Sequence, residues 1–434
     1  MMKIKHFVLF ISIFLCQLLL AQNPILNKYT FGEGFKFSDK DNSEISMGGY
    51  IQNSLEIKYN STDTTSDAYN RFRMRRLRYR LAGDMPKYKI NYRFQIDLSG
   101  TPEIGDEGNG NFLFDAWVAY NPTPKTQIKF GQSISPTENL ELLMISNSLQ
   151  LPERSRLTSA FGIVREFGIF TSSEFKASRN FYIKPAISLT NGDGQNVFVN
   201  DRGGFKIGGR VDFLPFGKFN NFGQFRQADV VRELTPKLLI GFIYSTNYGV
   251  SSRRGEGNTI IYLNDSLKEV LPNFTKYGVD FLFKYKGFSM LGEYIQTTAT
   301  VPNDISIRVR NDGSTATTFL VNGVQDVENY VKGRMMLGSG YNIQAGYYFK
   351  NRISIDARYT NLRADLNSFL NNPTYYNRPN YYTFGLSKYL SRGYGFKIQA
   401  SATYVELSAG SLDIFGAPLI NNEWIGNIIT TLSF

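Results

Sequence analysis

The richest chemistry in the sequence lies in RFRMRRLRYRL, residues 71–81, where six arginines occur in eleven positions. Guanidinium groups stay charged and bind phosphates or carboxylates through paired hydrogen bonds. The arginines alternate with large apolar residues, as in a strand with one polar and one apolar face. The doublet Arg75-Arg76 interrupts this period of two. A channel that selects anions needs arginine or lysine side chains along its lumen.

The first 21 residues have the pattern of a secretory signal peptide. Lys3 and Lys5 precede an apolar block over residues 7–20, and Ala21 is followed by polar residues. We expect cleavage after Ala21, which leaves residues 22–434 as one mature domain. A lipoprotein that is acylated at Cys16 is the alternative, and the bulky residues before that cysteine argue against it.

Removal of residues 1–21 would exclude most catalytic chemistry from the mature chain. Its only cysteine, Cys16, and its only histidine, His6, both lie in the signal segment. A mature chain without them has no disulfide, no thiol nucleophile, no serine–histidine triad and no ordinary zinc site. The remaining acidic pairs, such as Glu138 and Glu141, have no supporting histidine or metal partner. We therefore predict no catalytic residue, no metal site and no cofactor.

The mature chain is basic and aromatic. Subtracting Lys3 and Lys5 from the 48 basic residues leaves 46 against 37 acidic residues, a net charge of +9. An exported basic protein suggests small anions or a lipid surface as partners, and not nucleic acid, although an average surface composition is the simpler explanation. Aromatic residues are 15% of the chain, yet no apolar run after the signal is long enough for a spanning helix.

Residues of alternating polarity recur along the mature chain. In residues 87–99, every second residue is apolar over thirteen positions, the length of a tilted transmembrane strand. The same alternation marks residues 45–59, 181–189 and 341–350. Each of these segments predicts a strand with one face toward water and one away from it.

The lengths of the connections favour a membrane barrel over a soluble sandwich. Short links, such as residues 83–87, 285–288 and 350–352, alternate with long polar ones, such as residues 132–161 and 296–333. Short turns on one side and long loops on the other are typical of bacterial outer-membrane barrels. We predict an all-β, antiparallel transmembrane barrel of about 16 strands. The connection over residues 214–234 does not fit, because a short turn is expected there.

The segment over residues 112–171 carries a family resemblance. It contains DAWVAY from Asp115, Gly131-Gln132, Pro136 with Glu138, the triplet Glu153-Arg154-Ser155 and Arg165-Glu166-Phe167-Gly168. In this order and spacing the motifs resemble the phosphate-selective porin O and P family, and the terminal Phe434 fits it. The resemblance implies a homotrimeric, anion-preferring channel in the outer membrane, whose third extracellular loop, residues 132–161, folds inward. Ser133-Ile134-Ser135 stands where relatives often carry a lysine, which weakens the case for phosphate.

Two sets of candidate site residues follow. The residues expected to line the pore and select anions are Arg76, Arg78, Arg80, Lys89, Arg93, Arg154, Lys184, Lys206 and Arg210. The residues expected in the constriction loop are Pro136, Glu138, Glu153, Arg154 and Ser155. The alternative is that the cations only brace the wall, paired with Glu56, Asp97, Asp115, Asp212 and Asp280. Arg154 has the same two interpretations: it faces the solute, or it pairs with Glu153 or Glu138.

The doublet at Arg75-Arg76 has two explanations. A β-bulge there would let Arg71, Arg73 and Arg75 face inward together with the arginines that follow. Alternatively, Arg71 and Arg73 lie at the extracellular rim against anionic lipid, and the membrane strand begins at Arg75.

Together these observations predict a porin that conducts small anions, with phosphate as a candidate solute. Two alternatives remain open. One is a channel for general or organic solutes whose arginines are structural. The other is a non-conducting surface barrel that serves adhesion or structure.

Overall fold

The computed structural model describes residues 25–59, 68–104, 112–196, 203–250, 252–256, 261–310, 312–368, 377–411, 418 and 421–434. The predicted signal peptide, residues 1–21, lies outside the described residues and stays a prediction. No helix within these ranges has the length and apolar character to cross a membrane.

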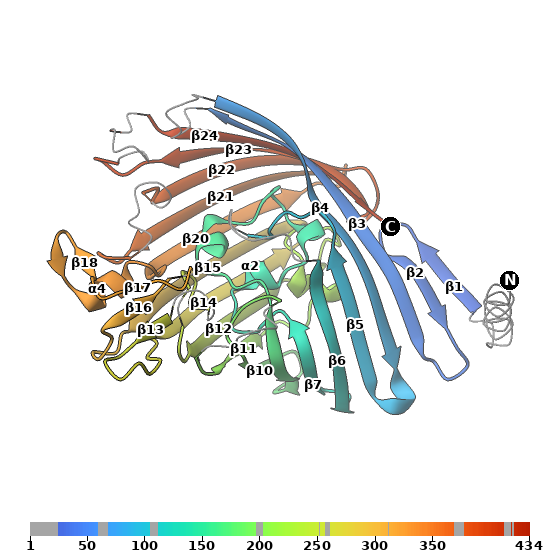
Figure 1. Cartoon of the computed structure of the whole chain (residues 1–434). Coiled ribbons are helices and arrows are strands. Elements are labelled where there is room, and N and C mark those ends of the chain that lie inside the picture. Colours follow the sequence, from blue (N-terminus) through green and yellow to red (C-terminus); the bar gives the residue numbers. More distant parts are fainter. Residues whose placement is uncertain are drawn as a thin grey trace, which may run out of the picture.

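Sixteen antiparallel strands form a closed barrel, which confirms the predicted fold class (Figure 1). The wall closes where the last strand pairs with β3, from Trp424 opposite Tyr59 to Ser433 opposite Tyr50. The sixteen strands are β3 Glu44–Tyr59, β4 Ala68–Met85, β5 Ile90–Asp97, β6 Leu113–Thr123, β7 Thr126–Ser133, β8 Glu166–Ser173, β10 Tyr182–Thr190, β11 Lys206–Leu214, β12 Lys237–Asn247, β14 Asn273–Tyr285, β15 Phe288–Thr300, β20 Gly338–Tyr348, β21 Ile353–Ala364, β22 Asn380–Tyr389, β23 Phe396–Glu406 and β24 Glu423–Ser433.

Shorter elements extend the barrel at both ends. A hairpin of β1 Ile25–Thr30 and β2 Gly34–Ser38 continues the wall beside the start of β3. The remaining strands are β9 Phe175–Lys176, β13 Ile261–Leu263, β16 Ile307–Val309, β17 Thr315–Ala316, β18 Leu320–Val321 and β19 Val324–Gln325. The helices are α2 Leu140–Leu143, α3 Arg156–Phe161, α4 Val327–Lys332 and the 3₁₀ turns η1 Pro86–Tyr88, η2 Ser146–Ser148 and η3 Asn220–Phe225.

The predicted alternation gives the wall an apolar outside and a polar inside. On β3, Ile57 and Tyr59 are exposed outward, whereas Gln52, Ser54 and Glu56 are buried inside. Backbone groups in lipid must be satisfied internally, and a closed barrel of this kind achieves that without a free edge. The exposed aromatic and aliphatic residues of the other strands belong to the same outer surface.

A β-bulge interrupts β4 at the arginine doublet. Gln52 of β3 pairs with Arg76, and the next residue, Asn53, pairs with Met74, so Arg75 is the extra residue. As a result Phe72 and Met74 face outward, and Phe72 is 83% exposed. The bulge explanation of the doublet is confirmed, and the strand does not begin at Arg75.

The prediction of a strand over residues 87–99 was wrong about where the strand starts. Residues 86–88 form the 3₁₀ turn η1, and β5 begins only at Ile90. Proline fixes φ and cannot donate a ladder hydrogen bond, and Lys89 adopts a left-handed conformation with φ 58°. Lys89 is therefore exposed in a turn, where its Nζ donates to the Pro122 carbonyl at 3.4 Å, and does not line the pore.

Among the described residues, two long connections enter the barrel. The third extracellular loop, residues 134–165, carries α2 and α3, and Figure 1 shows α2 enclosed by the wall strands. The connection over residues 215–236 enters from the opposite end. We call this connection, residues 215–236, the insertion. Its Phe219 packs with Leu140 and Met144 of the third loop in one buried cluster. The connection that is too long for a turn is thus a second inward segment.

Deleting Arg75 should prevent correct assembly of the barrel. Without the extra residue, one half of β4 must turn its arginines to the lipid face, at a cost of up to roughly 4 kcal/mol for each arginine near the midplane. We expect loss of the folded, heat-modifiable band on gel electrophoresis. Arg75→Ala keeps the strand length and should retain that band. Equal recovery of folded protein from the two variants would contradict the role of the bulge.

Candidate functional site

Glu103 is the centre of an ion-pair network inside the barrel. Its carboxylate accepts from Arg76 Nε at 2.7 Å, from Arg78 Nη2 at 2.7 Å and from Arg154 Nε at 2.8 Å. Burial on its own raises the pKa of this carboxyl, but the three arginines lower the pKa well below its usual value. The second extracellular loop is thereby fixed to β4 and to the third loop.

Arg78 is held on every side. It also donates to Asp97 at 2.7 Å and to the Tyr50 hydroxyl at 2.9 Å. Its guanidinium lies 3.7 Å from the centre of the Phe114 ring, and Arg165 lies 3.8 Å from the same ring. A cation stacked on an aromatic ring and paired with carboxylates braces the wall and is shielded from a passing solute.

Carboxylates of the third loop bind to cations on the wall strands β11, β14 and β21. Glu138 contacts Lys276 at 2.6 Å and Lys206 at 3.4 Å. Glu141 accepts from Arg358 at 2.7 Å and from the backbone amide of Ser155 at 2.8 Å. Because all of these groups are buried, the loop is anchored to the wall by charge.

Ser155 and the residues around it shape the loop itself. Ser155 is the N-cap of α3, where its side chain accepts from the Thr158 amide. Arg154 donates to the Met144 carbonyl at 2.9 Å as well as to Glu103. Neither Glu153 nor Glu138, the partners predicted for Arg154, accepts from it in the described contacts. The missed partner, Glu103, lies in another loop, which sequence spacing does not reveal.

Most of the predicted pore cations are therefore wall braces. Arg210 donates to Asp280 at 2.9 Å and also contacts Asp212, and Lys184 contacts Glu174 at 3.1 Å. Arg76, Arg78, Arg154, Lys206 and Arg210 are all buried with carboxylate partners. Asp97, Asp212 and Asp280 were correctly predicted as bracing partners.

Arg80 and Arg93 are arranged differently. Among the described residues neither forms an ion pair, and the nearby carboxylate of Asp115 is already paired with Arg165 at 2.6 Å. Arg93 lies 5.4 Å from the centre of the Trp117 ring, and Lys129, which sequence reasoning missed, lies 4.8 Å from it. These cations keep an excess of positive charge on the β4–β7 wall.

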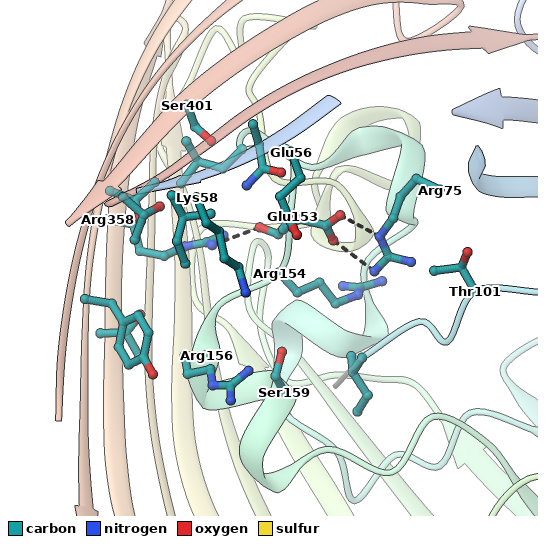
Figure 2. A pocket seen from close by; sticks show the side chains of 18 of the residues that line it. Glu56, Lys58, Arg75, Thr101, Glu153, Arg154, Arg156, Ser159, Arg358 and Ser401 are labelled. Carbon is teal, nitrogen blue, oxygen red and sulfur yellow. Dashed lines mark hydrogen bonds and ion pairs between the residues drawn. The ribbon is translucent and has the colours of Figure 1, made fainter. Parts of the chain in front are cut away.

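A cavity of about 690 Å³ opens on the extracellular side of the third loop (Figure 2). Glu153 projects into its centre, where Arg75 Nη2 donates to the carboxylate at 2.9 Å and Arg76 Nη2 at 3.3 Å. The basic residues that line it are Lys58, Arg71, Arg73, Arg75, Arg154, Arg156, Arg358 and Arg378, and the acidic ones are Glu56, Glu103, Glu153 and Glu423. We call this cavity the vestibule. Its lining has eight cations and four carboxylates.

The insertion meets the third loop below the vestibule. The side chain of Gln227 is fully buried. Its Oε1 accepts from the backbone amide of Gln150 at 2.8 Å, and its Nε2 donates to the Glu141 carboxylate at 3.1 Å. The amide of Ile145 donates to the Phe225 carbonyl at 3.0 Å. These direct bonds make the two inward segments one packed unit that narrows the lumen. Over the part of the chain described, no group of His, Cys, Asp and Glu is arranged to hold a metal ion.

Removing the Glu103 carboxylate should destabilise the barrel strongly. Glu103→Ala leaves Arg76, Arg78 and Arg154 without their shared counter-charge, and breaking a buried pair in this way costs about 3–5 kcal/mol. We expect a clear fall in the thermal unfolding midpoint of the detergent-solubilised barrel. Glu328→Ala, at an exposed pair with Lys332, is the control and should change it little. Equal midpoints for both variants would contradict the bracing role.

The ion pairs of Glu103 also predict that the stability of the barrel depends on pH. Because the folded-state pKa of Glu103 lies below the ordinary value of 4.5, its stabilisation is complete above that value and is lost as the pH falls through the folded pKa. The unfolding midpoint should stay level down to about pH 5 and then fall. Glu103→Gln should weaken this fall. An identical pH profile in the variant would assign the acid sensitivity to other groups.

Comparisons with known proteins agree with this architecture. The family model for phosphate-selective porin O and P matches residues 45–324, more than half of the chain. The fold is similar to that of OprB from Pseudomonas putida, with 12% identity, a TM-score of 0.51 and coverage of 89% of this chain and 94% of that one. It is also similar to the outer membrane channel DcaP of Acinetobacter baumannii, with 10% identity, a TM-score of 0.50 and coverage of 92% and 99%.

No curated protein matches the chain. At these identities the solved structures show the fold alone, and the family match adds the class of protein and its location. The chain belongs to the phosphate-selective porin O and P family of diffusion channels in the bacterial outer membrane.

Proposed function

We propose that this porin prefers anions and that the vestibule sets the preference. The observation that carries the proposal is the lining of the vestibule, with twice as many cations as carboxylates. A mouth lined by one sign of charge raises the local concentration of the opposite ion and speeds its entry. Arg71 contributes most directly, because its side chain is 53% exposed and its ion pair with Glu56 is long, at 3.9 Å.

The buried arginines have a different part in this proposal. Arg76, Arg78 and Arg210 are saturated by carboxylates, so they hold the shape of the lumen. Arg80 and Arg93 extend the positive lining, since ion pairs do not cancel their charge among the described residues. Anions would thus meet the vestibule first and this part of the wall later.

Phosphate as a solute, trimer assembly and removal of residues 1–21 belong to the same proposal. Phosphate is the anion in the description of the matched family. The missing lysine at Ser133-Ile134-Ser135 is partly replaced, because Lys129 Nζ donates to Ser133 Oγ at 3.1 Å. Outer-membrane lipids would contact the exposed apolar face, which includes Phe72 and Phe130.

A non-conducting surface barrel is the second candidate. It is favoured by one observation, the direct bonding of the third loop to the insertion across the lumen. Current through a reconstituted bilayer separates the two candidates, since such a barrel would pass none.

Bilayer recordings under a KCl gradient test the anion preference. The reversal potential should indicate a larger permeability for chloride than for potassium. Arg71→Gln combined with Arg73→Gln should lower the permeability ratio by about twofold, the effect of two screened charges roughly 8 Å from the ion. Arg310→Gln, at an exposed arginine outside the vestibule, is the matched control. A reversal potential that favours potassium would overturn the proposal.

A further inference from the structure

We propose that the vestibule is a binding site for polyhydroxylated organic carboxylates, the class that includes sugar acids. This inference rests on the proposed anion preference and adds the chemical class of the solute. It depends on a feature that charge alone does not explain. Besides its charged residues, the vestibule is lined by uncharged hydroxyl and amide groups on β22, β23 and β24.

Strand register places the uncharged groups in a continuous row. Thr383 of β22 lies opposite Thr403 of β23, and Ser401 of β23 lies opposite Asn427 of β24. Strands are spaced about 4.8 Å apart, so the three strands carry this row across about 10 Å of wall. All four residues line the vestibule. The row offers several hydrogen-bonding groups to one solute.

The ends of the row are charged. Thr383 pairs with Arg358 on β21, while Asn427 pairs with Glu56 on β3, which in turn lies opposite Arg71 on β4. A solute that binds along the wall therefore meets a guanidinium beside Thr383 at one end, and the Glu56 carboxylate with the guanidinium of Arg71 beyond it at the other. This order suits a molecule with a carboxylate at one end and hydroxyl groups along its length.

Two side chains in the row have unused hydrogen-bonding capacity. Thr383 and Thr403 bond to each other at 2.9 Å, but Ser401 and Asn427 bond through their side chains to no group among the described residues. Asn427 is only 9% exposed. Its amide is not among the buried polar atoms that lack a partner, so it is open to the vestibule that the residue lines. Hydroxyl groups of a solute could therefore bond to Ser401 and Asn427.

The arginines of β4 already bind one carboxylate in the vestibule. Glu153, in the centre of Figure 2, is held by Arg75 and Arg76 and lies 3.7 Å from Arg73. Its side chain is 26% exposed to the vestibule. The chain thus places a carboxylate of its own where the arginines converge. The Arg73 side chain is 22% exposed, and its contacts with Glu56 and Glu153 are long, at 3.4 and 3.7 Å, so this side can accept a second carboxylate.

The size of the vestibule favours an organic solute over a small inorganic ion. Its volume of about 690 Å³ lies within the range of roughly 300–1,000 Å³ that is typical of sites for organic ligands. A phosphate ion could bind the arginines but is too small to span the row of neutral groups, which extends over about 10 Å.

Three probes test the site on the full chain reconstituted in a planar bilayer: D-glucuronate, D-glucose and inorganic phosphate. Each is added on the extracellular side, and the concentration that halves the KCl current is measured. Glucuronate should act at a concentration about tenfold below that of either other probe, since it alone combines a carboxylate with several hydroxyl groups. Calorimetric titration of the detergent-solubilised protein with the same probes gives an independent affinity.

Two variants assign the binding to the row. Ser401→Ala with Asn427→Ala should raise the half-blocking concentration of glucuronate about tenfold, and by more than that of phosphate. Arg71→Gln should raise it for both anions. Thr430→Ala, on the outward face of the same strand β24, is the matched control and should leave glucuronate block unchanged. A heat-modifiable band confirms that each variant is folded.

The outcomes separate this inference from the proposed function. A chloride-selective channel that glucuronate blocks no better than phosphate overturns the inference and leaves the proposed function in place. Equal loss of glucuronate and phosphate affinity in the double variant also overturns it, because the row then has no specific role. A potassium-selective channel with a glucuronate block that depends on Ser401 and Asn427 overturns the proposed function and supports the site.

Discussion

The pairing of wall cations with loop carboxylates is the interaction on which the interior of the barrel depends. Glu103 and Glu141 each come from an extracellular loop and each bind arginines that project from the strands. A guanidinium inside a barrel wall loses much of its hydration, so a carboxylate must replace the lost water. The loops therefore complete the wall electrostatically, and their paths through the lumen follow from where the arginines lie.

This constraint separates two tasks that a single residue type performs. Arg76 and Arg78, which are buried and multiply bonded, fix geometry. Arg71 and Arg73 continue the same strand but reach water, so their charge acts on solutes. The bulge at Arg75 makes both tasks possible on one strand, because it keeps all of these side chains on the inner face. Solvent access therefore decides whether an arginine fixes the geometry of the wall or acts on solutes.

The wall could be predicted from the sequence because its signal is local. Alternation at a period of two identifies strands, and the break at Arg75-Arg76 made a bulge one of two explanations, between which the strand register decided. Asp97, Asp212 and Asp280 lie on strands and could be named as partners of the arginines, whereas the pairings made by Glu103 and Glu153 could not, since these two residues lie in irregular loops whose direction no periodicity reports. Lys89 was misplaced because the alternating pattern continues through a turn that Pro86 begins. The inward course of residues 215–236 was missed for the same reason as the loop partners.

The contact between the insertion and the third loop changes what sequence variation means in this protein. Loops normally tolerate exchange better than strands, because they lie on the surface. Here Gln227 fits between Glu141, Gln150 and Gln344 as a core residue does in a water-soluble domain. Segments that enter from opposite faces of the membrane thus pack against each other, and each limits which side chains the other can carry. Their residues must be inherited as compatible pairs, and a loop transplanted from a relative would need its counterpart from across the bilayer.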